Sequence, residues 1–148
     1  MQEERSAVAR PFGPIWNEAL SDQSGAKFRE VAAPDVSLEG SVFAAPVEGR
    51  EEVWTSFRTA AGITDKLTFI EESTGPDRTF LTWEQEALGL RAGGVTVLSF
   101  DSSGLVDNVA IHHRPLGVVL AFSAELGRRL GDSVGPGVFD QPESNGDR

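Results

Sequence analysis

Apolar residues recur at two different spacings along this chain, and each spacing predicts a different kind of element. Recurrence every three or four residues is typical of an amphipathic helix, whereas strict alternation is typical of a half-buried strand. The helical spacing occurs in three stretches of the first half and again near the end. It predicts helices over residues 8–20, through 28–32, over 49–62 and over 115–130.

Alternation predicts the strands, and short segments rich in Gly, Pro, Asp and Ser predict the turns between them. The loop after the first strand covers 40–46, and the later joints include 89–94 and Ser102-Ser103-Gly104. The predicted strands are 35–39, 66–73, 78–88, 95–101 and 105–114.

The order of these elements is helices, one strand, a helix and then a run of strands. It predicts an α+β, cone-shaped fold in which N-terminal helices pack on a curved, mostly antiparallel sheet, with a C-terminal helix after it. Helices that lie across a curved sheet leave a cavity between the two layers. We therefore expect a pocket as well as a fold.

A length of 148 residues corresponds to one domain. We expect a flexible N-terminus over 1–7 and a single domain over 8–131, which includes the helix 115–130. Gly, Pro, Asp and Ser dominate the rest of the chain. Because such a composition buries little apolar surface, we expect an irregular or disordered tail over 132–148.

The composition of the chain argues against several kinds of binding partner and site. A net charge of −10 argues against nucleic acid and anionic membranes, since both would be repelled at long range. The absence of cysteine excludes disulfides, thiol nucleophiles and zinc–thiolate sites, and it fits a cytoplasmic location. Neither a membrane-length apolar run nor a secretory signal is recognisable.

The two histidines of the chain, His112 and His113, end the last predicted strand. Neighbouring side chains on a strand point to opposite faces, so the pair cannot easily chelate one metal ion, and we expect no metal site. Val109, Ile111 and His113 share one face. A neutral imidazole in a pocket can accept a proton or orient water, and the alternative is a histidine packed at the end of a core strand.

Three segments carry a resemblance to a known group of proteins: Ala33-Pro34-Asp35-Val36-Ser37-Leu38-Glu39-Gly40, residues 47–53 and residues 98–106. On these motifs the chain resembles bacterial members of the nuclear transport factor 2-like superfamily, also called SnoaL-like or ketosteroid-isomerase-like. The resemblance spans residues 8–115. It implies the cone fold, a pocket that faces Val109, Ile111 and His113, and a homodimer formed through the convex face of the sheet.

The catalytic groups of the superfamily are largely absent at the matching positions. The resemblance places Trp16 where steroid isomerases have a tyrosine, Gly40 next to Glu39 where they have the base, and Thr96 where they have a protonated aspartic acid. Epoxide hydrolases of this fold have an Asp-Arg-Asp set where this chain has Thr96, Gly94 and His113. SnoaL-like cyclases have a carboxylate near the position of His113. Steroid-isomerase and epoxide-hydrolase chemistry are therefore not expected.

The resemblance implies a small-molecule pocket protein in one of two forms. The first is an isomerase, cyclase or lyase that needs no cofactor and acts on an apolar ligand, with His113 as the acid or base and Glu39 as a second polar group. The second is a non-catalytic dimeric module that binds such a ligand. In both forms the expected ligand contacts are Trp16, Trp54, Thr96, Leu98, Val109 and Ile111.

Overall fold

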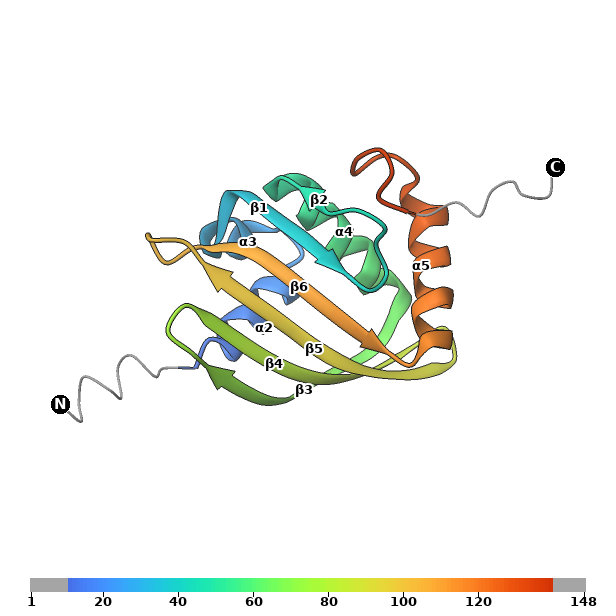
Figure 1. Ribbon diagram of the computed structural model, residues 1–148, viewed down its shortest axis with the longest axis horizontal. Coiled ribbons are helices and arrows are strands. Elements are labelled where there is room, and N and C mark those ends of the chain that lie inside the picture. The colour runs from blue at the N-terminus through green and yellow to red at the C-terminus, as the bar shows by residue number, and fades with distance from the viewer. Residues whose placement is uncertain (1–10, 140–148) are drawn as a thin grey trace.

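The computed structural model describes residues 11–139 and has the predicted α+β architecture. N-terminal helices are followed by a six-stranded, mostly antiparallel sheet and a C-terminal helix (Figure 1). The expectations for residues 1–7 and for the end of the tail, 140–148, lie outside the described residues.

The helices are α2 (Gly13–Ser21), α3 (Ala26–Val31), α4 (Arg50–Ile63) and α5 (Leu116–Leu130). The strands are β1 (Ala32–Gly40), β2 (Val47–Glu48), β3 (Thr64–Thr74), β4 (Arg78–Ala87), β5 (Leu90–Phe100) and β6 (Val106–Arg114).

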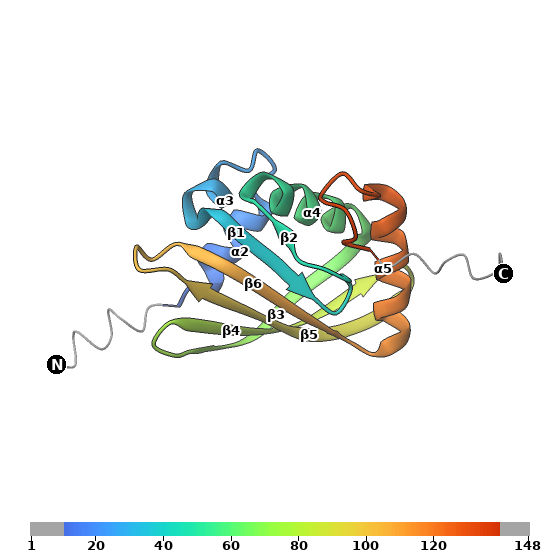
Figure 2. The same cartoon turned by 45° about the horizontal axis from the view of Figure 1, so that its top comes forward.

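The strands lie in the order β2-β1-β6-β5-β4-β3. Neighbours pair antiparallel except β1 and β6, which pair in parallel. Helices α2, α3 and α4 lie over one face of the sheet, and α5 stands across one end of it (Figure 2). We call the face under the helices the inner face and the opposite one the outer face. This arrangement leaves side chains from both layers to fill or line the space between them.

Burial alternates along the strands as the sequence pattern requires. In β4 every second residue from Thr79 to Ala87 is buried, and the residues between them are exposed or half-buried. The buried set packs against the helices, where Trp16, Phe28 and Phe57 form an aromatic cluster with ring centroids 5.7 to 5.9 Å apart. Burial of these large rings helps to hold the helices on the sheet.

The start of α2 depends on a carboxylate that lies far away in the sequence. Glu72 of β3 accepts hydrogen bonds from the backbone N–H groups of Phe12 at 2.6 Å and Gly13 at 3.0 Å. The first N–H groups of a helix have no partner within it, and a negative charge there is favoured by the helix dipole. Glu72 therefore fixes the N-terminus of α2 to the sheet.

The segment after α5 contains turns and packs on the domain. Val134, Val138 and Phe139 are buried, and Phe139 lies 5.6 Å from the ring of Phe43. The carbonyl of Val138 also accepts a hydrogen bond from the backbone of Ala44. Within residues 11–139 no helix combines the length and the apolar character needed to cross a membrane.

Candidate functional site

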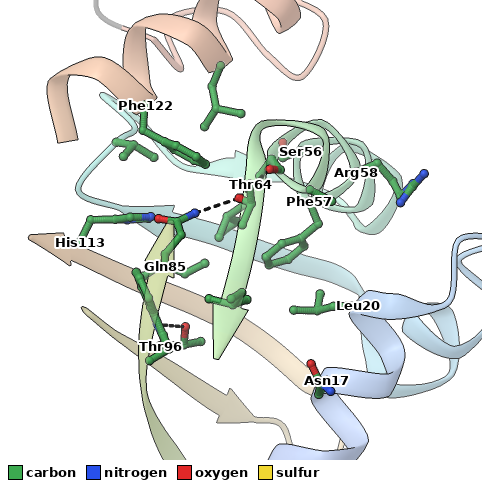
Figure 3. Close-up of a pocket in the computed structure, with 18 of the residues that line it drawn as sticks. Asn17, Leu20, Ser56, Phe57, Arg58, Thr64, Gln85, Thr96, His113 and Phe122 are labelled. Atoms are coloured by element: carbon green, nitrogen blue, oxygen red, sulfur yellow. Dashed lines mark hydrogen bonds between the residues drawn. The ribbon is translucent and has the colours of Figure 1, made fainter. Parts of the chain in front are cut away.

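A cavity of about 400 Å³ lies between the helices and the inner face of the sheet. Its walls come from α2, α4, α5 and from every strand except β2 (Figure 3). At its inner end the lining side chains are buried or half-buried: Leu38, Trp83, Gln85, Thr96, Ile111, His113, Phe122 and Leu126.

Much of the rim of the cavity is polar and exposed. Asn17, Ser21 and Gln23 border it on the side of α2, and Asp65 and Lys66 border it at the start of β3. The half-buried Arg58 also belongs to the lining. Among the described lining residues, Arg58, Asp65 and Lys66 carry the full charges, so charge is confined to the outer part of the cavity.

At the inner end, three residues lie side by side on neighbouring strands. Gly94 of β5 is paired with Trp83 of β4 on one side and with His113 of β6 on the other. The rings of Trp83 and His113 meet with centroids 4.9 Å apart and an angle of 70° between their planes. A Cβ at Gly94 would lie 2.7 Å from the Trp83 ring, so a larger residue there would displace that ring from the contact.

Two aromatic rings pack against His113. Besides Trp83, Phe122 of α5 contacts the imidazole with ring centroids 5.4 Å apart. Burial lowers the pKa of His113 from 6.5 to about 4, and the charge of His112 acts in the same direction. Desolvation has this sign for a base because it disfavours the protonated, charged form. The imidazole is therefore neutral at pH 7, and it is a weak proton acceptor.

Gln85 is the second polar group of the inner wall, and only 7% of its surface is exposed. Its amide nitrogen donates a hydrogen bond of 2.9 Å to the hydroxyl of Thr64. That hydroxyl donates its own hydrogen to the carbonyl of Ala60 at 2.9 Å. The Gln85 amide oxygen has no partner, and neither has Nδ1 of His113.

A third polar group in this wall, the indole N–H of Trp83, has a hydrogen-bond partner. The indole N–H of Trp83 donates a buried hydrogen bond of 3.0 Å to the hydroxyl of Thr96. The inner end of the cavity thus combines apolar surface with neutral donors and acceptors. Such a lining is typical of sites for small organic molecules.

Four of the eight residues predicted to form the site line this cavity: Trp16, Thr96, Ile111 and His113. The alternation along β6 holds, since Ile111 and His113 face the cavity whereas His112 and Arg114 are exposed.

The other four residues lie elsewhere. Leu98 and Val109 are fully buried in the core, and Trp54 stacks on Phe28 with ring centroids 5.2 Å apart, outside the lining. Glu39 is exposed and does not line the cavity, because its neighbour Leu38 takes the inward position on β1. The structure therefore does not bring Glu39 together with His113.

Sequence reasoning missed Gln85 and Phe122. The alternation of β4 contained the signal for the first of them. Gln85 shares a parity with the apolar Leu81 and with Trp83, whereas Glu84 and Glu86 share the other parity and are exposed. The position of Phe122 could not be predicted from α5 alone. The spacing of apolar residues identifies the buried face of that helix, but it does not identify the strand against which this face packs.

Within residues 11–139, no three His, Asp or Glu side chains gather closely enough to hold a metal ion.

Comparison with known proteins identifies the fold. No protein-family model matches the sequence, and no curated protein matches it. Three solved structures illustrate the structural matches. A bacterial protein with a cystatin-like fold from Silicibacter pomeroyi has a TM-score of 0.75 at 17% identity, covering 84% of this chain and 89% of its own. A steroid delta-isomerase from Pseudomonas aeruginosa has a TM-score of 0.70 at 18% identity, covering 80% and 88%.

A candidate SnoaL-like polyketide cyclase from Jannaschia sp. CCS1 has a TM-score of 0.61 at 17% identity, covering 83% of this chain and 93% of its own. These matches confirm the resemblance predicted from the sequence at the level of the fold. Proteins that share a fold at such identities can have different functions, so the activity has to be argued from the site.

Proposed function

We propose that this chain, which has the SnoaL-like, ketosteroid isomerase-like fold, binds a neutral, largely apolar small molecule in the cavity beneath α2 and α4. The observation that carries the proposal is the distribution of charge along the cavity. Arg58, Asp65 and Lys66 lie toward the outside, whereas the inner wall consists of apolar side chains and uncharged polar groups. A charged ligand group at the inner end would lose its hydration without gaining an opposite charge.

The volume of the cavity supports the same proposal. About 400 Å³ lies within the range of sites that bind drug-sized ligands and is large enough for a molecule of several fused rings. Aromatic surface from Trp16, Phe57 and Trp83 lines the walls, and flat apolar molecules pack well against such rings.

The test is a titration with Nile red, a neutral apolar dye whose emission rises in apolar sites. We expect saturable binding to the wild-type chain. Ala61, an exposed residue of α4 at the rim, offers a position from which a large side chain can fill the entrance. Ala61→Trp should weaken binding at least about tenfold, since it removes volume that the ligand occupies.

Thr55→Trp is the matched control, because Thr55 is an exposed residue of the same helix outside the lining. It should bind Nile red as the wild type does. Equal affinity of all three proteins, or a lack of saturable binding to the wild type, would count against the cavity as the binding site.

Acid–base catalysis as an isomerase, cyclase or lyase remains the alternative, and it would have to use His113. His113 is the titratable group of the inner wall, but burial lowers its pKa to about 4. A general base is most effective when its pKa is close to the working pH, so binding is better supported than proton abstraction. A screen of neutral substrates with wild type and His113→Ala separates the two: turnover that disappears in the variant would favour the enzyme.

A further inference from the structure

Two polar atoms at the inner end of the cavity are left without a hydrogen-bond partner. They are the amide oxygen of Gln85 and Nδ1 of His113. A buried polar atom without a partner is costly, on the order of 1–3 kcal/mol, and in native proteins such atoms are rare. Figure 3 shows the His113 ring and the Gln85 amide pointing toward one another in the cavity. A ligand that supplies both missing partners would remove both costs.

The orientation of the Gln85 amide is fixed by its neighbours. The Thr64 hydroxyl has one hydrogen and gives it to the carbonyl of Ala60. Thr64 can therefore only accept from Gln85, which requires the amide nitrogen to face Thr64 and leaves the amide oxygen as the atom without a partner. The inner wall consequently presents an acceptor that needs a hydrogen from the ligand.

His113 offers the complementary group. A neutral imidazole carries one N–H, and with the proton at Nδ1 the ring nitrogen that lacks a partner is a donor. The backbone N–H of His113 is already bonded to the hydroxyl of Ser41 at 3.0 Å, which fixes the end of β6. The rings of Trp83 and Phe122 both pack against the imidazole and restrict its movement.

We infer that the ligand is an apolar alcohol whose hydroxyl group bridges Gln85 and His113, donating to the amide oxygen and accepting from Nδ1. This inference rests on the proposed function and names the chemical class of ligand for the same cavity. A ketone oxygen only accepts, so it would satisfy His113 but lie against the Gln85 oxygen with a like partial charge. A protonated amine could donate to Gln85, but the inner wall has no carboxylate to balance its charge.

The test compares three probes with one carbon skeleton: cyclododecanol, cyclododecanone and cyclododecylamine, each titrated calorimetrically into the full chain at pH 7.5. We expect the alcohol to bind about tenfold more tightly than the ketone, and the amine to bind more weakly than the alcohol. Gln85→Met removes the acceptor at similar volume. In this variant the alcohol and the ketone should therefore bind with about equal affinity. Glu86→Met, the next residue of β4 and exposed on the outer face, is the control and should keep the wild-type preference.

Thr64→Val provides a second variant, which keeps Gln85 but frees its amide to rotate. The ketone should then gain affinity relative to the alcohol, because the amide nitrogen can turn toward the ligand.

Ketone binding equal to or tighter than alcohol binding in the wild type would overturn the inference. So would tighter binding of the amine, or a preference that survives in Gln85→Met. The wild-type comparison needs no variant to fold. If the ketone binds as tightly as the alcohol, or if the preference survives in Gln85→Met, the cavity still binds a neutral ligand and the proposed function stands. Tighter binding of the amine contradicts the proposed function as well, and that function also fails if neither neutral probe gives saturable heat.

Discussion

His113 shows how a single residue acquires its chemistry from its neighbours. Two aromatic rings remove water from the imidazole, and the pKa falls to about 4. The alternation of β6 placed the two histidines on opposite faces, and the resemblance to the superfamily indicated that His113 faces the cavity. The pattern of β6 could not predict the ring of Phe122, which comes from α5. Nor could it reveal that Glu39, close to Gly40, faces away from the site.

The neutral state of His113 predicts how stability depends on pH. Its folded-state pKa lies below the ordinary value of 6.5, so the unfolded chain binds more protons between about pH 4 and 6.5. The free energy of unfolding should therefore rise with pH across this window and be reduced below it. This lowering of the pKa corresponds to roughly 3.5 kcal/mol, at about 1.4 kcal/mol per pKa unit.

Urea unfolding of wild type and His113→Gln at several pH values between 4 and 7 measures this contribution. The carboxylates titrate in both proteins, so the difference between the two curves isolates the histidine. His112→Gln, at an exposed position, should retain the steep dependence of the wild type. Parallel curves for wild type and His113→Gln would show that the imidazole is not desolvated as described.

At the scale of elements, β5 contains the clearest departure from the sequence pattern. Residues 89–94 were predicted as a joint because Gly93 and Gly94 are typical of turns, yet the strand begins at Leu90. A Cβ at Gly94 would lie 2.7 Å from the ring of Trp83 and would also meet the carbonyl of His112. Glycine at this position therefore allows close packing inside the strand. The groups that require it belong to the neighbouring strands β4 and β6.

Gly94→Ala should destabilise the fold by about 1–3 kcal/mol, the usual cost of overfilling a packed site. It should also disturb the contact between Trp83 and His113, and so weaken binding in the cavity. Gly117→Ala is a matched control, because a Cβ there meets open space on α5. Alanine at that position should stabilise the helix by about 0.5–1 kcal/mol.

Denaturant midpoints with unchanged slopes provide the measurement for both variants. Equal stability of Gly94→Ala and wild type would contradict the role given to this glycine.

Local patterns predicted most elements but not their long-range partners. The helical stripes and alternating segments correspond to α2 to α5 and to β1 and β3 to β6. The two-residue β2 has no periodicity to detect. The parallel pairing of β1 with β6 and the contact of Glu72 with α2 join residues distant in the sequence, so no local pattern contains them.

At the scale of the whole molecule, the helices cover one face of the sheet and leave the other without a second layer in the described chain (Figure 2). Phe80 and Val97 are paired on that outer face, where Phe80 is exposed and Val97 is half-buried.

Dimerisation through this face stays a prediction. Sedimentation of the wild type and of Val97→Lys would test it. A wild-type dimer should dissociate in the variant, and a monomeric wild type would contradict the prediction.

The central claim is that this cavity binds a neutral apolar ligand at its inner end, and the three tryptophans allow it to be tested inside one molecule. Trp16 and Trp83 line the cavity, whereas Trp54 lies outside the lining. The measurement is a titration with cyclododecanol followed by the three indole N–H resonances in ¹⁵N-labelled protein. We predict saturable shifts of Trp83 and Trp16, with Trp54 much less affected. Unchanged resonances, or a shift of Trp54 as large as that of Trp83, would contradict the account.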